Sequence, residues 1–185
     1  MNNPREKWNR IYSNRNEPDA PAEVLTRYVH LLPPTGIALD LAAGLGANAC
    51  FLADRGLEAH AWDISNVAMS RLTHPGVVAH LRDVESNPPE PDTFDVIVVS
   101  RFLARSICPA LAAAMKPGGL LFYQTFVQEK VAGVGTSNPA FLLKRGELLD
   151  LFQGLRVLAF HDEGQVGDIQ TGLRNESLLV ARREL

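Results

Sequence analysis

The stretch ALDLAAGLGANA, residues 38–49, carries residue types that can bind a small ligand. An apolar, strand-like run ends at Asp40, Gly44 and Gly46 follow, and the chain then continues in a helical pattern. Glycine lets the backbone approach a bound molecule closely. This segment therefore predicts a cofactor loop between a strand and a helix.

Two cofactors compete for this loop, a nicotinamide dinucleotide and S-adenosylmethionine. Gly44, Gly46 and Ala49 have the spacing of the dinucleotide fingerprint, and Asp63 follows where a ribose-binding acid is expected. However, Asp40 ends the strand just before the glycines, where its charge would repel a pyrophosphate. A carboxylate there favours S-adenosylmethionine, which carries a sulfonium and an ammonium group and has no phosphate.

Two further expected strands end in polar groups that can face the same ligand. One strand extends to Asp83, which Val84 follows, and the next ends at Ser100 and Arg101. Ligands of open α/β sheets bind at the carboxyl ends of the strands, near the point where the strand order reverses. We therefore expect these residues to lie beside the glycine loop.

Alternating strands and helices must position these groups. Strands are predicted at residues 37–42, 58–64, 76–83, 94–100 and 120–126, with helical patterns between most of them. Ser106 is expected to cap the helix before the fifth strand, with Pro109 in its first turn. The alternation predicts a Rossmann-like, doubly wound α/β fold with a mostly parallel sheet and helices on both faces.

The whole chain of 185 residues is expected to form one domain. Its expected parts are a helical lid at residues 1–35, a cofactor-binding core at 36–126, and a last part at 127–185. The last part combines a long substrate-side loop, a short helix and a C-terminal hairpin. Glycine-containing loops of this length are usually functional, so we expect this one to close over a small molecule.

The segments LDLAAGLG, WDIS, LRD, FDVIVVS and KPGG resemble, in order and spacing, the class I S-adenosylmethionine-dependent methyltransferases. EKWNRIY near the start, and NPAFLLKRGELLDLF with a following HDE, resemble the small tellurite-resistance (TehB-like) methyltransferase family. The resemblance implies a seven-stranded sheet with an antiparallel last strand, S-adenosylmethionine as cofactor and S-adenosylhomocysteine as product. Two departures stand out: Ala42 replaces the first glycine of the usual pattern, and SRFLARS replaces the usual residues after the fourth strand.

With this cofactor, each polar group has an expected role. Asp63 should accept hydrogen bonds from both ribose hydroxyls, while Gly44 and Gly46 bring the backbone against the methionine and ribose. Asp40 should hold the loop and face the ammonium through water, or else serve only to bond the loop amides.

The adenine is expected to meet Asp83 and the backbone of Val84, with Ile64 packed on the adenine or ribose. For Asp83 the alternative is a surface turn, and for Ile64 it is the core. The remaining predicted cofactor-binding residues are Ala42, Asn48, Ser100, Trp8 and Tyr12.

Trp8 and Tyr12 share one helical face and are candidates for an aromatic lid over the sulfonium, unless this stripe is ordinary packing. Tyr12, Arg101 and Arg174 are the candidates for catalytic residues. Together with Glu129, the two arginines could reach the substrate end of the cleft, or be solvated surface charges. The five histidines and two cysteines show no metal-ligand spacing, so no metal is expected.

Composition narrows the class of protein. With 46% apolar residues, 21% charged residues and a net charge of −3, the chain resembles an ordinary globular protein, and no nucleic acid partner is expected. No apolar run approaches the roughly 20 residues of a membrane span, so no membrane association is expected. The first residues lack a signal-peptide core. We expect a cytoplasmic monomer or homodimer.

These observations predict methyl transfer by in-line displacement to a small-molecule acceptor. No histidine or tyrosine is placed as a general base after the fourth strand, which favours soft nucleophiles such as thiol, selenium or tellurium species. Three alternatives stay open: a methyltransferase acting on RNA or protein, an NAD-dependent oxidoreductase on the same loop, and a degenerate fold that binds only partners.

Overall fold

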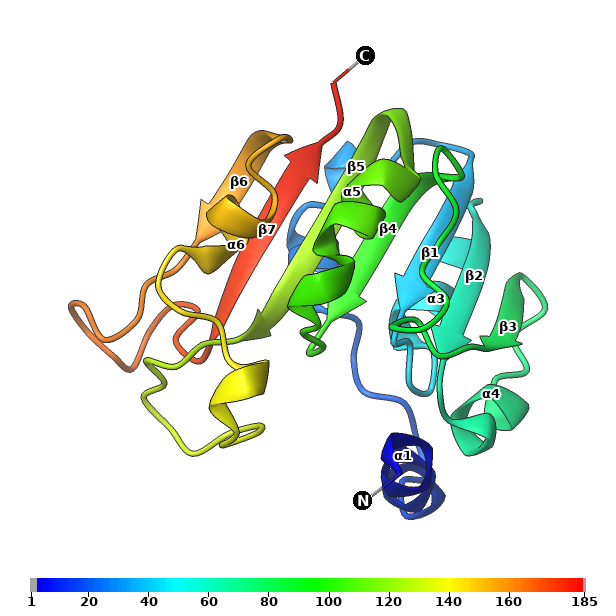
Figure 1. Ribbon diagram of the computed structural model, residues 1–185, viewed down its shortest axis with the longest axis horizontal. Coiled ribbons are helices and arrows are strands. Elements are labelled where there is room, and N and C mark those ends of the chain that lie inside the picture. Colours follow the sequence, from blue (N-terminus) through cyan, green and yellow to red (C-terminus); the bar gives the residue numbers. More distant parts are fainter. Residues whose placement is uncertain (1–2, 185) are drawn as a thin grey trace.

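Seven strands form one open sheet in the order β3-β2-β1-β4-β5-β7-β6 (Figure 1). The computed structural model describes residues 3–184. Strands β1 to β5 are parallel, and β7 runs antiparallel to both β5 and β6, which confirms the expected sheet. The strands are β1 (Ile37–Leu41), β2 (Glu58–Asp63), β3 (Val77–Leu81), β4 (Phe94–Ser100), β5 (Met115–Phe126), β6 (Arg156–His161) and β7 (Glu176–Arg182).

Short helices cover both faces of the sheet. Helices α5 and α6 pack on one face, and α2 and α3 pack on the other (Figure 1). The helices are α1 (Pro4–Ser13), α2 (Glu23–Arg27), α3 (Ala47–Ala53), α4 (Asn66–Arg71), α5 (Cys108–Ala114) and α6 (Glu147–Leu151), with 3₁₀ turns η1 (Val29–Leu31), η2 (Arg105–Ile107) and η3 (Pro139–Phe141).

Strand β4 shows why the central strands are nearly continuous apolar runs in the sequence. In β4, Val96 and Val98 are buried against the α2 and α3 side, whereas Ile97 and Val99 are buried against the α5 side. A strand covered on both faces needs apolar residues at every position. Because β1 lies between β2 and β4, the strand order reverses there, and a ligand cleft is expected at the carboxyl ends of β1 and β4.

Two local expectations are wrong. Strand β3 ends at Leu81, because Asp83 closes a turn: its carboxylate accepts from the N–H of Glu85 (3.1 Å), and its carbonyl from the N–H of Asn87 (2.9 Å). Ser106 does not cap α5, because the 3₁₀ turn η2 runs directly into that helix. The expected proline in the first turn of α5 is confirmed.

Two segments lie at the carboxyl edge of the sheet: the N-terminal helix and the chain that follows β5. Helix α1 lies beside α4, below the ends of β1 and β2 in Figure 1. After β5 the chain folds back on itself, because the N–H of Leu143 donates to Phe126 O (2.9 Å) and that of Gln128 to Leu143 O (2.9 Å). None of the helices within residues 3–184 combines the length and apolar character needed to cross a membrane.

Candidate active site

Asp40 joins β1 to the first turn of α3. Its side chain is buried, with one oxygen accepting from the N–H of Ala49 (3.0 Å) and the other from Asn48 Nδ2 (3.3 Å). Burial raises the pKa of Asp40 to about 7, against the lowering effect of these hydrogen bonds. The bond to Ala49 is the structural role considered from the sequence, and a contact with a ligand ammonium stays a prediction.

The loop between β1 and α3 depends on left-handed backbone. Ala42, Gly44 and Gly46 have φ angles of 57°, 55° and 82°. Alanine adopts this region at a cost that glycine avoids, which explains why the usual pattern has glycine at position 42. A Cβ on Gly46 would lie 2.6 Å from Leu72 Cδ1, and one on Gly44 would lie 2.7 Å from Tyr12 Oη, so a larger residue at either position would have to displace a neighbouring side chain.

Asp63 ends β2 and holds the same loop from the other side. It is 5% exposed and accepts from the N–H groups of Gly44 and Ser65, each at 2.8 Å. A carboxylate has about four acceptor positions, so positions remain for the hydroxyls of a ligand. Burial raises the pKa of Asp63.

Together, Asp40 and Asp63 place two buried carboxyls with raised pKa at the switch point. Among the residues the structure describes, neither carboxyl has an arginine, lysine or histidine within ion-pair distance. Buried charges in proteins are normally paired. The site therefore favours a ligand that brings positive charge.

Helix α1 covers this loop. Tyr12 lies against Gly44, and Trp8 stacks on Tyr12 with ring centroids 5.7 Å apart. Burial, and then the charge of Asp63, raise the pKa of Tyr12, so its hydroxyl stays neutral at physiological pH. The expected aromatic pair is therefore at the loop, and its contact with a sulfonium stays a prediction.

Two side chains that the sequence analysis did not single out fasten α1 to α4. Asn9 Oδ1 accepts from Ser65 Oγ (2.7 Å) at the start of α4. Arg71, at the end of α4, donates to the carbonyls of Tyr12 (2.8 Å) and Arg15 (2.6 Å). No local pattern marks these contacts, because each joins residues more than 50 positions apart.

The expected adenine contacts are spread along the edge of the site. Ile64 and Ser100 are half-buried at the ends of β2 and β4. Val84 is buried in the core, while Asp83 is half-buried in the turn after β3. An adenine contact at these positions stays a prediction.

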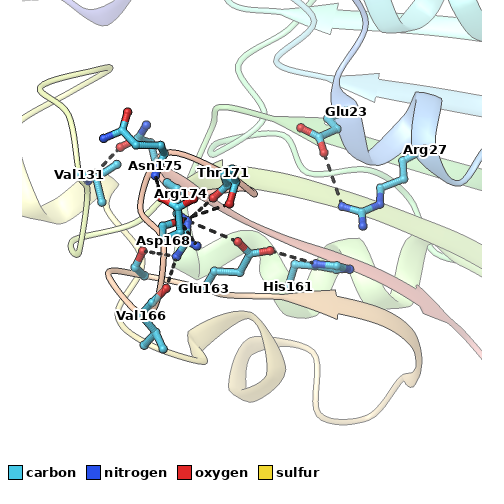
Figure 2. A network of polar contacts seen from close by, with 12 residues as sticks. Glu23, Arg27, Val131, His161, Glu163, Val166, Asp168, Thr171, Arg174 and Asn175 are labelled. Atoms are coloured by element: carbon cyan, nitrogen blue, oxygen red, sulfur yellow. Dashed lines mark hydrogen bonds and ion pairs between the residues drawn. The ribbon is translucent and has the colours of Figure 1, made fainter.

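Three charged residues were considered for the substrate end of the cleft, and of these only Arg101 lies at the end of β4. Glu129 is exposed and pairs with Arg145 at 2.6 Å. Arg174 instead organises the loop between β6 and β7, as Figure 2 shows. Its guanidinium donates to backbone carbonyls that include those of Val166 (2.6 Å) and Asp168 (2.8 Å).

Arg105 fixes the segment after β5. Its guanidinium donates to both carboxylate oxygens of Glu147, at 2.6 and 2.9 Å, and to the carbonyls of Ala140 (2.6 Å) and Leu142 (2.9 Å). The Arg105 hydrogen bonds hold the pKa of Glu147 below its usual value. The expected substrate-side loop is thus anchored at its C-terminal end.

Gln124 and Glu176 were also missed, although the sequence held a signal. Each is a polar residue next to an apolar run, LLFY before Gln124 and LLVA shortly after Glu176, and both are buried. Gln124 Oε1 accepts from the N–H of Val24 (2.7 Å), and Gln124 Nε2 donates to Glu176.

Residues 3–184 contain no cluster of three or more metal-ligating side chains.

An open seven-stranded sheet with an antiparallel β7 and an acid–glycine loop at its switch point has the fold of the S-adenosylmethionine-dependent methyltransferases. The chain is similar to TehB from Haemophilus influenzae, with 17% identity, a TM-score of 0.73, and coverage of 96% of this chain and 67% of that chain. The expected resemblance is confirmed at the level of the fold.

Two further structures are similar over nearly the whole chain. A TehB-like methyltransferase from Corynebacterium glutamicum has 15% identity and a TM-score of 0.66, covering 97% of this chain and 95% of that chain. A structure from echinomycin biosynthesis, where a disulfide bond is converted into a thioacetal group, has 19% identity and a TM-score of 0.71, covering 97% and 92%. No protein-family model and no curated protein sequence matches the chain.

Proposed function

We propose that this protein is an S-adenosylmethionine-dependent methyltransferase that acts on a small molecule. The observation that carries the proposal is the pair of buried carboxyls, Asp40 and Asp63, which have no basic partner within residues 3–184. S-adenosylmethionine brings two positive charges and a ribose to such a site. An NAD pyrophosphate would place negative charge beside both carboxyls, at an energetic cost.

The residues at the loop fit this cofactor. The free acceptor positions of Asp63 suit the ribose hydroxyls, and the glycine backbone at Gly44 and Gly46 leaves room for close approach. Asp40 supplies negative charge for the ammonium side. Tyr12 and Trp8 offer aromatic faces, which attract a sulfonium.

When bound, the cofactor supplies a methyl group on a positively charged sulfur that leaves as a neutral thioether. The chain's own part is to align the acceptor and exclude water, and alignment alone contributes about 7–11 kcal/mol in favourable cases. Helix α1, fastened to α4 by Asn9 and Arg71, covers the loop for this purpose.

The acceptor we propose is a soft nucleophile. A thiolate or a heavier analogue needs little help from a general base. The similar structure from echinomycin biosynthesis concerns chemistry at sulfur, which supports the same class. The tellurite-resistance resemblance of the sequence points the same way.

Calorimetric titration with S-adenosylhomocysteine and with NAD tests the proposed function. We expect the wild-type chain to bind the former and not the latter, and Asp63→Asn to bind S-adenosylhomocysteine at least tenfold more weakly. Asp150→Asn is the matched control, because Asp150 is an exposed acid on α6. Binding of NAD instead, or unchanged affinity in Asp63→Asn, would contradict the proposal.

A further inference from the structure

Arg101 is held in an unusual backbone conformation directly after β4. Its φ angle is 54°, a region that residues other than glycine rarely adopt, and its N–H donates to Gln124 O at 2.8 Å. Strained residues of this kind gather at binding and catalytic sites. The conformation turns the chain at the carboxyl end of β4, next to the loop that follows β1.

A buried carboxylate fixes the Arg101 side chain. Arg101 Nε donates to Glu176 Oε1 at 2.8 Å, and the other Glu176 oxygen accepts from Gln124 Nε2. The Glu176 side chain is 8% exposed, whereas that of Arg101 is 54% exposed. One edge of the guanidinium is therefore anchored inside the protein while the rest faces solvent.

The outer nitrogens of this guanidinium make no hydrogen bond within residues 3–184. Nη1 forms a long ion pair with the exposed Asp19, at 3.9 Å from its Oδ2, but this distance is too great for a hydrogen bond. A guanidinium with one anchored edge and free outer N–H groups matches the geometry of a carboxylate.

The surroundings of Arg101 connect it with the substrate-side segment. Its guanidinium carbon lies 5.7 Å from the centre of the Phe126 ring, at the end of β5. Gly135 packs against the same ring so closely that a Cβ there would lie 2.5 Å from Phe126 Cζ. Arg101 is therefore between the glycine loop of the first strand and the segment expected to close over the acceptor.

We propose that Arg101 binds an anionic group, such as a carboxylate, on the methyl acceptor, and that Glu176 positions its guanidinium. This inference rests on the proposed function, which it deepens by assigning a charge to the acceptor. Arg174 is unsuited to this role, because backbone carbonyls of its own loop occupy its N–H groups.

Two thiols of similar size provide the test: mercaptoacetate, which carries a carboxylate, and 2-mercaptoethanol, which is neutral. Each is titrated calorimetrically into the full chain, with and without S-adenosylhomocysteine. We expect wild-type protein to prefer mercaptoacetate by at least tenfold, and Arg101→Gln to lose that preference. Arg101→Lys should keep part of it, since the charge remains but the fork of N–H groups is lost.

Glu176→Gln tests the positioning role, since a residue that only stabilised the fold would change binding of both thiols equally. We expect it to weaken mercaptoacetate binding selectively. Arg156→Gln, which removes an exposed arginine of β6 paired with Glu184, is the matched control and should change neither affinity.

Equal affinity of the wild-type chain for the two thiols, or the same preference in Arg101→Gln, would overturn the inference. Thermal melting of every variant shows whether it is folded. The thiols are titrated both with and without S-adenosylhomocysteine, so the two hypotheses can fail separately. Failure to bind this nucleoside contradicts the proposed function, whereas the preference for mercaptoacetate is measured independently of it.

Discussion

The backbone N–H of Gly44 donates to the carboxylate of Asp63 at 2.8 Å, and this bond ties the loop after β1 to the end of β2. The same loop is tied to α3 through Asp40 and Ala49. Two carboxyls thus shape the backbone that we propose as the cofactor cradle.

Gly46→Ala should destabilise the fold and weaken S-adenosylhomocysteine binding. The new Cβ would overlap Leu72, and the φ of 82° costs a residue other than glycine about 1–2 kcal/mol. Urea unfolding measures the loss. Gly154→Ala is the control, because a Cβ there meets no atom within 4 Å. Equal stabilities of the two variants would show that the loop can relax.

Asp40 should make the unliganded protein less stable as the pH rises. The pKa of its carboxyl is raised from 3.8 to about 7, so its contribution to stability is fully present below pH 4 and is lost as the pH rises through 7. A shift of this size corresponds to about 4 kcal/mol. Urea unfolding at pH 5 and pH 7.5 should show a smaller pH effect in Asp40→Asn than in wild type. Parallel pH profiles of the two proteins would contradict this.

Binding of S-adenosylmethionine should release protons near neutral pH. A cationic ligand favours the ionised form of Asp40, so affinity should increase between pH 6 and pH 8. Calorimetry in two buffers of different ionisation enthalpy counts the protons released. Asp40→Asn should reduce this number and flatten the pH dependence, while Asp150→Asn should do neither. A wild-type affinity that is flat over this range would oppose the assignment.

Arg71→Ala should loosen helix α1 without unfolding the sheet. The variant loses hydrogen bonds to the carbonyls of Tyr12, Arg15 and Asn16, at 2.8, 2.6 and 3.0 Å. Amide hydrogen exchange in α1 should accelerate about tenfold or more, and S-adenosylhomocysteine affinity should fall. Arg55→Ala removes an exposed arginine in the turn after α3 and should leave α1 unchanged. Unaltered exchange in Arg71→Ala would mean that the lid is held by packing alone.

The sequence by itself determined the alternation of strands and helices and the place of the glycine loop. These features are local: buried strands such as FDVIVVS are apolar at nearly every position, and the loop needs glycine where the backbone turns left-handed. Asp40 was found because an acid near the end of an apolar strand stands out locally, and Asp63 because of its spacing from the glycine loop.

The tertiary structure alone decided which polar groups meet. Arg101 reaches Glu176 only because β7 lies antiparallel beside β5, which brings together residues 75 positions apart. Arg71 reaches the end of α1 across 59 positions. Such pairs depend on how the elements pack and leave no periodic trace in the chain, so sequence patterns could place each residue on its element but could not name its partner.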